Sequence, residues 1–108
     1  MRSQEYRSGV VVLGSDYKAL GVVRSLGKRG IPIVVIDNQP RSAWFSRYVV
    51  KRLRWHGAMD NEAFLHFLLH AAKTLHLEQW TLLPLPDETV ELVARNREQL
   101  GQVYTLAT

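Results

Sequence analysis

Residues 10–37 contain two short apolar runs joined by a segment with helical periodicity. The first run, VVVL at 10–13, is continuously apolar and mostly β-branched, which is typical of a strand covered on both faces. Apolar residues over 16–28 then recur three and four positions apart, as on one face of a helix. The second run, IVVI at 33–36, ends at Asp37. Two such strands separated by a helix need a crossover connection, so we expect them to lie parallel in one sheet.

The rest of the chain repeats this alternation of strand-like and helix-like segments. In order, it predicts a strand at 49–55 with cations on both of its faces, a helix at 61–76 capped by Asp60, and a strand at 80–85. A helix capped by Asp87 follows, which runs to about Leu100 with Val90 facing the core, and then a short strand at 103–107. The cations of the 49–55 strand favour an edge position. We therefore predict an α/β fold: a three-layer, Rossmann-like, doubly wound and mainly parallel sheet of about five strands.

The composition limits the class of protein. A chain of 108 residues is long enough for one domain and too short for two, so we predict a single domain over 1–108. The hydrophobic fraction of 46% is that of an ordinary globular protein. The absence of cysteine excludes disulfides and thiolate chemistry and fits a reducing compartment, so we expect a cytoplasmic protein. The longest apolar runs fall far short of the ~20 residues that cross a bilayer, and no membrane association is expected.

Polar residues follow three of the predicted strands at the point where each ends. In an open parallel sheet, ligands bind at the carboxyl ends of the strands, near the point where the strand order reverses. The residues at these ends are Gly14, Ser15 and Asp16 after the first strand, Asp37 and Asn38 after the second, and Pro86, Asp87 and Glu88 after the fourth. We therefore expect all three groups to share the rim of one crevice.

The first of these turns raises the question of a phosphate-binding loop. A dinucleotide fingerprint that begins at Gly14 needs two further glycines, but Asp16 and Ala19 occupy their positions. The charge of Asp16 would also repel a pyrophosphate, so a conventional NAD site is not favoured. In the alternative interpretation, Ser15 or Asp16 caps the following helix. Asp37 stands where a ribose-binding carboxylate would, and it equally suits a turn, so both interpretations stay open.

His66 and His70 lie four positions apart, which places both imidazoles on one face of the predicted helix. A zinc site of the HExxH type needs a glutamate directly after the first histidine, but Phe67 stands there and no third ligand is evident. A solvated helix face is the favoured interpretation, and we predict no metal site.

The segment 41–55 interleaves five cations with four aromatic residues. Such a pattern is found in proteins that bind single-stranded nucleic acid, and the formal net charge of +4 leaves room for an anionic partner. An edge strand with charged outer positions and aromatic residues packed beneath a loop explains the same pattern. The edge strand is the favoured interpretation.

Three longer stretches together carry a resemblance to a known family. They are VVLGSDYKALGVVRSLGKRGIPIVVID, FSRYVVKRLRW and LLPLPDETVELVARNREQL, with the helix opened by Asp60 between the last two. In their order and spacing the chain resembles the N-terminal (pre-ATP-grasp) domain of ATP-grasp enzymes. The similarity is to carboxylate–amine ligases related to the large subunit of carbamoyl-phosphate synthase, and it covers nearly the whole chain.

The resemblance implies a function and a set of site residues. In that family the first domain is Rossmann-like, whereas ATP and magnesium are bound between two later lobes. The reaction passes through an acyl phosphate, which an amine or another nucleophile attacks. The implied substrate-binding residues here are Gly14, Ser15, Asp16, Asp37, Asp87, Glu88 and Thr89. Nothing in this sequence corresponds to the ATP-grasp lobes or their metal-binding carboxylates. We therefore expect neither a catalytic residue nor a bound cofactor in this chain alone.

The resulting expectation is a substrate-binding and docking domain, the N-terminal fragment of a longer ATP-dependent ligase. Its expected partners are the downstream ATP-grasp lobes and a small-molecule substrate. An apolar surface that normally meets those lobes would also allow a homodimer. A nucleotide- or dinucleotide-binding Rossmann module is the alternative, and a nucleic-acid-binding domain that uses segment 41–55 is the second alternative.

Overall fold

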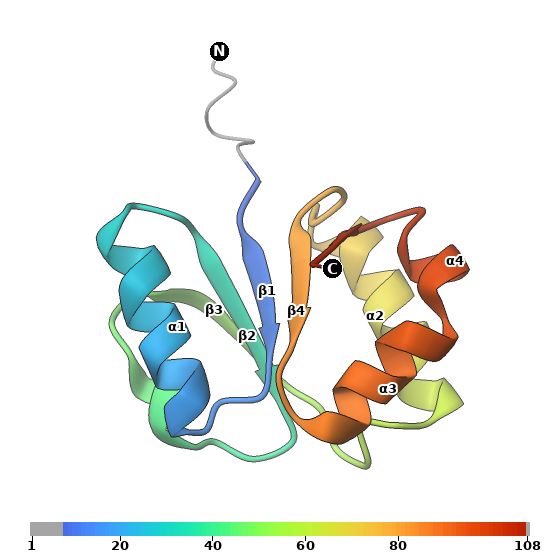
Figure 1. The fold of residues 1–108 in the computed structure, drawn as a ribbon, viewed down its shortest axis with the longest axis horizontal. Helices are drawn as coiled ribbons and strands as arrows, with labels where there is room; N and C mark the ends of the chain where they lie inside the picture. The colour runs from blue at the N-terminus through green and yellow to red at the C-terminus, as the bar shows by residue number, and fades with distance from the viewer. Residues whose placement is uncertain (1–7, 108) are drawn as a thin grey trace.

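The computed structural model describes residues 8–107 and contains one five-stranded sheet. Its elements are β1 (Val10–Leu13), α1 (Tyr17–Lys28), β2 (Ile33–Asp37), the 3-10 helix η2 (Ser42–Phe45), β3 (Val49–Arg54), α2 (Glu62–Thr74), β4 (Thr81–Pro84), α3 (Asp87–Arg95), α4 (Arg97–Leu100) and β5 (Thr105–Leu106). The strand order is β3-β2-β1-β4-β5, and every pair of neighbours is parallel (Figure 1). This confirms the predicted Rossmann-like α/β fold, with β3 at an edge.

Two apolar clusters, one on each face of the sheet, form the core. On the first face, Val12 and Val35 of the sheet pack with Ala19 and Val23 of α1 and with η2. We call this face the α1 side. On the opposite face, which we call the α2 side, alternate residues of the same strands pack against α2, α3 and α4. The sequences of β1 and of residues 33–36 of β2 are continuously apolar, as expected for strands that are buried on both faces.

The strand order reverses beside β1. The chain runs from β1 to β2 and β3 in one direction, and then crosses over to β4 and β5 in the other. Two adjacent parallel strands with helices on opposite faces leave a crevice beyond their carboxyl ends. The fold therefore places the ends of β1 and β4 at the position where ligands bind in open α/β sheets.

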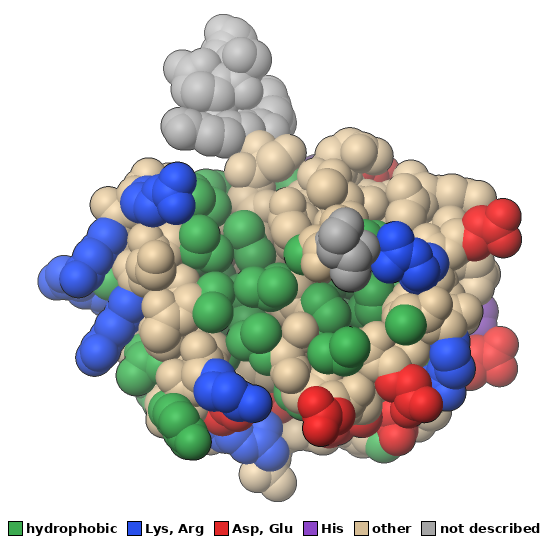
Figure 2. Space-filling view, viewed as in Figure 1, with side chains coloured by type: hydrophobic (Ala, Val, Ile, Leu, Met, Phe, Trp, Pro, Cys, Tyr) green, Lys and Arg blue, Asp and Glu red, His purple; other side chains and the backbone are tan. Residues whose placement is uncertain are grey.

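Part of the sheet has no helix over it. Figure 1 looks between α1 and the α2–α4 layer, and no helix is drawn in front of β4 in this view. Figure 2 has the same viewpoint and shows hydrophobic side chains gathered in this part of the surface. Leu83 and Leu85 are half-buried and pack on the α1-side cluster. An apolar surface of this kind is typical of a contact with another protein surface.

Three local predictions were wrong. The α2 helix is capped by Asn61, whose side-chain oxygen accepts a 3.0 Å hydrogen bond from the Phe64 N–H, and not by Asp60. The α3 helix begins at Asp87 itself, so Asp87 lies inside the first turn and does not cap it. Its Val90 faces outward and is 46% exposed.

The remaining differences concern where the elements end. The predicted helix 87–100 breaks at Asn96, whose side chain donates a 2.8 Å hydrogen bond to the Leu92 carbonyl. The positive φ of 57° at His76 lies outside the helical region, and α2 ends before it at Thr74. Within residues 8–107, no helix is long and apolar enough to cross a membrane.

Candidate functional site

A crevice of about 290 Å³ lies at the carboxyl edge of the sheet, where the strand order reverses. The residues that line it are Gly14, Ser15, Asp16, Asp37, Asn38, Arg41, Met59, Pro86 and Glu88. They come from the turns after β1, β2 and β4 and from the loop before α2. All three groups of residues that were expected to share a rim therefore contribute to it, although Asp87 of the third group does not.

The turns after β1 and β4 touch at Gly14 and Pro86. Gly14 has a φ of +98°, a backbone conformation that side chains disfavour. A Cβ atom added to Gly14 would lie 2.8 Å from Cδ of Pro86, which is too close for any contact. The Gly14 N–H also donates a 2.8 Å hydrogen bond to the Ile36 carbonyl at the end of β2. Glycine is therefore required here to bring the three turns together.

A buried network joins the ends of β1 and β2. Asp37 is 1% exposed, and its carboxylate accepts a 2.6 Å hydrogen bond from the Ser15 hydroxyl. The Asn38 N–H donates to the same carboxylate at 2.7 Å, and Nη1 of Arg41 lies 2.7 Å from each of its oxygens. Each carboxylate oxygen thus accepts two hydrogen bonds, which uses its acceptor capacity. The contacts favour the structural interpretation of Asp37 over ribose binding.

Asp16 caps the α1 helix, as one of the two interpretations of this turn predicted. Its side-chain oxygen accepts a 3.1 Å hydrogen bond from the Ala19 N–H. Ser15 has the different role of donating to Asp37. A capping carboxylate already satisfies part of the helix N-terminus and places a negative charge beside it. This arrangement disfavours a phosphate at the same position.

The charge of the crevice is therefore negative. Among its lining residues Arg41 is the only cation, and that cation is paired with Asp37. The carboxylates of Asp16 and Glu88 remain, with no further cation in the lining. Asp16 is half-buried and Glu88 is exposed, so both carboxylates are accessible, and a ligand that carries an ammonium group suits such a crevice because opposite charges attract.

The structure brings five of the seven predicted site residues together and leaves two outside. Asp87 is exposed and does not line the crevice. Thr89 is buried, and its hydroxyl donates a 2.7 Å hydrogen bond to the Pro86 carbonyl, so it stabilises the start of α3. Sequence reasoning did not assign Arg41 to the site, although its position four residues after Asp37 was a usable signal. Met59 comes from a loop with no recognisable pattern.

The basic aromatic segment 41–55 is largely used by the fold itself. Trp55 packs against Phe64 and Phe67, with ring centroids 5.6 and 4.9 Å apart. The guanidinium groups of Arg52 and Arg54 donate to backbone carbonyls of neighbouring loops. These contacts, together with the edge position of β3, favour the edge-strand interpretation.

The two histidines of α2 are exposed. Nε2 of His66 lies 3.7 Å from a carboxylate oxygen of Glu62, one turn earlier on the same helix. Among the residues that the structure describes, no three histidine, cysteine or acidic side chains lie close enough together to hold a metal ion.

Comparisons with known proteins do not assign the chain to a family. No protein-family model matches the chain, and no curated protein or solved structure matches it either. The coordinates themselves support a compact, Rossmann-like α/β fold with an all-parallel sheet. The resemblance to ATP-grasp ligases stays a prediction that rests on the sequence motifs.

Proposed function

We propose that this chain is the N-terminal substrate-binding and docking domain of an ATP-dependent carboxylate–amine ligase of the ATP-grasp family. The observation that carries the proposal is the charge of the carboxyl-edge crevice. Asp16 and Glu88 both line it, while the cation of Arg41 is held by Asp37. This surplus of negative charge favours an ammonium group over a phosphate. The ligand of the crevice is therefore the amine that the ligase joins to a carboxylate.

The chain contributes binding and orientation to this reaction. ATP with Mg²⁺ activates the carboxylate as an acyl phosphate, and lobes outside these 108 residues bind both. Asp16 and Glu88 hold the ammonium group of the acceptor, and Gly14 lets the turns after β1 and β4 pack against each other beneath it. The network around Asp37 keeps the turns after β1 and β2 fixed relative to each other. We propose no catalytic residue, metal or cofactor for this chain alone.

A nucleotide- or dinucleotide-binding module is the alternative for the same crevice. Asp16 adds negative charge where a phosphate would lie, and the carboxylate of Asp37 has no acceptor position left for a ribose hydroxyl. Both observations weigh against it. Nucleic-acid binding through segment 41–55 is the least supported alternative. The side chains of Arg52, Arg54 and Trp55 already donate hydrogen bonds to backbone carbonyls of the fold.

The uncovered apolar face of the sheet supports the docking part of the proposal. Leu83 and Leu85 are half-buried there, and hydrophobic side chains gather on the same face (Figure 2). We propose that the ATP-binding lobes of the cytoplasmic enzyme pack on this face. Without those lobes, the chain forms a homodimer through it. Sedimentation equilibrium over a range of concentrations measures this association, and Leu83→Gln should weaken it.

Titration calorimetry of the chain with a panel of α-amino acids and other primary amines tests amine binding. For an amine that binds, Glu88→Gln should weaken the affinity about tenfold, or ~1.4 kcal/mol, because one charged contact is lost. Glu91→Gln is the matched control, since Glu91 lies on the same helix, is exposed and does not line the crevice. Equal weakening by both variants, or micromolar affinity for Mg-ATP, would contradict the proposal.

A further inference from the structure

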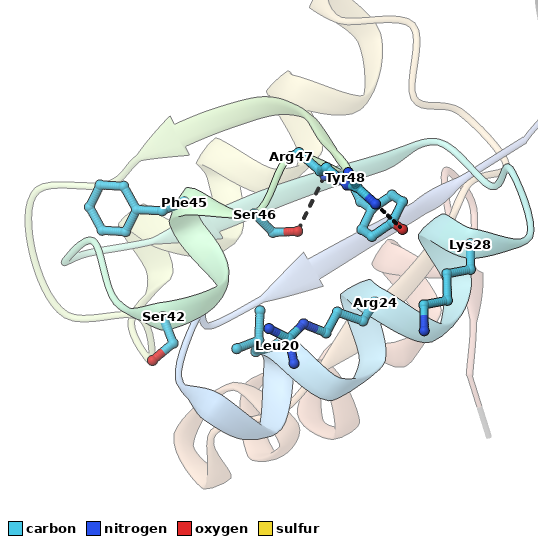
Figure 3. Close-up of a pocket in the computed structure, with 8 residues that line it drawn as sticks. All are labelled: Leu20, Arg24, Lys28, Ser42, Phe45, Ser46, Arg47 and Tyr48. Carbon is cyan, nitrogen blue, oxygen red and sulfur yellow. Dashed lines mark hydrogen bonds between the residues drawn. The ribbon is translucent and has the colours of Figure 1, made fainter.

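A second and larger groove lies between α1 and the segment 42–48 that leads into β3 (Figure 3). Its volume is about 530 Å³. The residues that line it are Leu20, Arg24, Lys28, Ser42, Phe45, Ser46, Arg47 and Tyr48. None of them lines the carboxyl-edge crevice, so the two sites are separate.

Three cations line this groove and no carboxylate does. Arg24 and Lys28 lie one turn apart on α1, and Arg47 comes from the opposite wall (Figure 3). Within residues 8–107, neither Arg24 nor Lys28 forms an ion pair or a side-chain hydrogen bond. Two like charges at this spacing destabilise a helix by about 0.2–0.5 kcal/mol. The groove therefore holds positive charge that the described residues do not neutralise.

Tyr48 fixes the position of the third cation. Its ring packs so closely on α1 that a Cβ atom at Gly27 would lie 2.3 Å from the ring. The guanidinium of Arg47 lies 5.0 Å from the centre of the ring, and its Nη2 donates a 3.1 Å hydrogen bond to the Tyr48 hydroxyl. This hydrogen bond, together with the charges of Arg47, Lys28 and Arg24, lowers the pKa of Tyr48.

The groove also offers hydroxyl donors. The Ser46 hydroxyl oxygen accepts a 3.2 Å hydrogen bond from the Tyr48 N–H, so its own proton can be donated to a ligand (Figure 3). Ser42 lines the same groove and is exposed. Guanidinium, ammonium and hydroxyl donors together suit an oxyanion with several charges.

We infer that the groove between α1 and segment 42–48 is a binding site for a small, multiply charged oxyanion, of the polyphosphate or polycarboxylate class. The site goes beyond the proposed function and does not depend on it. A long nucleic-acid strand fits less well, because Arg52 and Arg54, which would extend the row of cations along β3, are bound to backbone carbonyls. Figure 2 shows several lysine and arginine side chains, without acidic neighbours, around α1, whereas the cations near α3 and α4 lie beside acidic side chains.

Thermal unfolding with inorganic pyrophosphate at low ionic strength tests this site. Pyrophosphate should raise the melting temperature in a saturable manner, because a ligand that binds the folded chain stabilises it. Arg24→Gln/Lys28→Gln should weaken the binding at least tenfold. Lys18→Gln/Arg29→Gln removes the same two charge types from α1 and from its C-cap, outside the groove, and should change the affinity less than twofold.

Two further arms separate the sources of the oxyanion. In the first, citrate replaces pyrophosphate. Whichever of the two ligands binds more tightly shows whether the site prefers a polycarboxylate or a polyphosphate, and either result supports the site. A single-stranded oligonucleotide is used in the second, and tighter binding of it than of either small ion would overturn the inference. Equal weakening by the two double variants would also overturn it, because the binding would then follow net charge alone. Without ligand, the Arg24/Lys28 variant should unfold no earlier than the parent chain, which shows that it is folded.

Discussion

The hydroxyl of Ser15 donates a 2.6 Å hydrogen bond to the buried carboxylate of Asp37, and this contact joins the end of β1 to the end of β2. Arg41 completes the arrangement from the following loop, with Nη1 2.7 Å from each carboxylate oxygen. The hydrogen-bonding capacity of the buried Asp37 carboxylate is therefore used within the protein itself. Asp16 and Glu88 remain at its rim, where they can meet a ligand.

Removing the charge of Asp37 should destabilise the fold. Asp37→Asn replaces a buried acceptor of four hydrogen-bonding contacts with a neutral amide and leaves Arg41 without its counter-ion. We expect a loss of about 2–4 kcal/mol in the free energy of unfolding, measured by urea denaturation. Asp60→Asn is the control, since Asp60 is exposed, and it should change the stability by less than about 0.5 kcal/mol. Similar losses in both variants would show that the network contributes little.

Gly14→Ala should destabilise the fold by about 1–3 kcal/mol. The alanine Cβ is disfavoured at a φ of +98° and would meet Pro86 at 2.8 Å. Gly21→Ala is the matched control, because Gly21 lies in α1 and a Cβ there has no neighbour within 4 Å. That variant should be more stable by about 0.5–1 kcal/mol, owing to the higher helix propensity of alanine. A Gly14 variant as stable as the parent chain would mean that the turns after β1 and β4 do not touch.

Gly27→Ala separates helix propensity from packing. Gly27 lies in the same helix as Gly21, yet a Cβ at this position would lie 2.3 Å from the ring of Tyr48. Movement of the ring disrupts the contact that holds Arg47 in the second groove. We expect lower stability than for Gly21→Ala, by about 1–3 kcal/mol, and weaker pyrophosphate binding. Thermal unfolding with and without pyrophosphate measures both effects, and a gain in stability equal to that of Gly21→Ala would contradict the contact.

Tyr104 should make the fold sensitive to alkaline pH. It is 1% exposed, its hydroxyl donates a 2.7 Å hydrogen bond to the Leu68 carbonyl, and burial raises its pKa. The unfolded chain loses this proton near pH 10, whereas the folded chain keeps it to higher pH. The contribution to stability is therefore complete below about pH 10 and decreases above it, by up to ~1.4 kcal/mol per pH unit.

The variant Tyr104→Phe isolates this effect. At pH 7 it should be less stable by about 1–2 kcal/mol, because the hydrogen bond to Leu68 is lost. Above pH 10 the difference from the parent chain should shrink, because the variant lacks the titrating group. Tyr17→Phe is the control, since Tyr17 is 77% exposed and should show neither effect. Unfolding in urea at several pH values checks the prediction, and a constant difference across this range would be the contrary result.

The fold could be predicted because its central strands are unambiguous. The runs VVVL and IVVI are short, mostly β-branched and without a polar face, and the helical segment between them requires a crossover, so together they indicate a buried parallel sheet. The residues at which helices begin were harder to predict. Asp60 and Asn61 are both good N-caps, and only the backbone geometry decides between them. Val90 was misplaced because one apolar residue at helical spacing does not show which face of a helix is covered.

The topology predicted the location of the candidate site at the ends of the strands, but it did not predict the side-chain contacts within the site. Gly14 and Asp37 follow directly from the carboxyl ends of β1 and β2. The hydrogen bonds that Ser15 and Arg41 donate to Asp37 depend on the directions of the side chains, which cannot be derived from the spacing of residues in the sequence. The second groove could not be predicted either, because Arg24 and Arg47 are brought together only when η2 packs beside α1.

Amide chemical-shift mapping of the isotope-labelled chain tests the central claim most directly, by titration with the amine panel and then with Mg-ATP. The account predicts that an amine ligand shifts the amide signals of Gly14, Ser15, Asp16 and Glu88, and that Mg-ATP leaves these signals unchanged. Saturable shifts of the same amides by Mg-ATP at micromolar concentration would contradict the account, because the crevice would then be a nucleotide site.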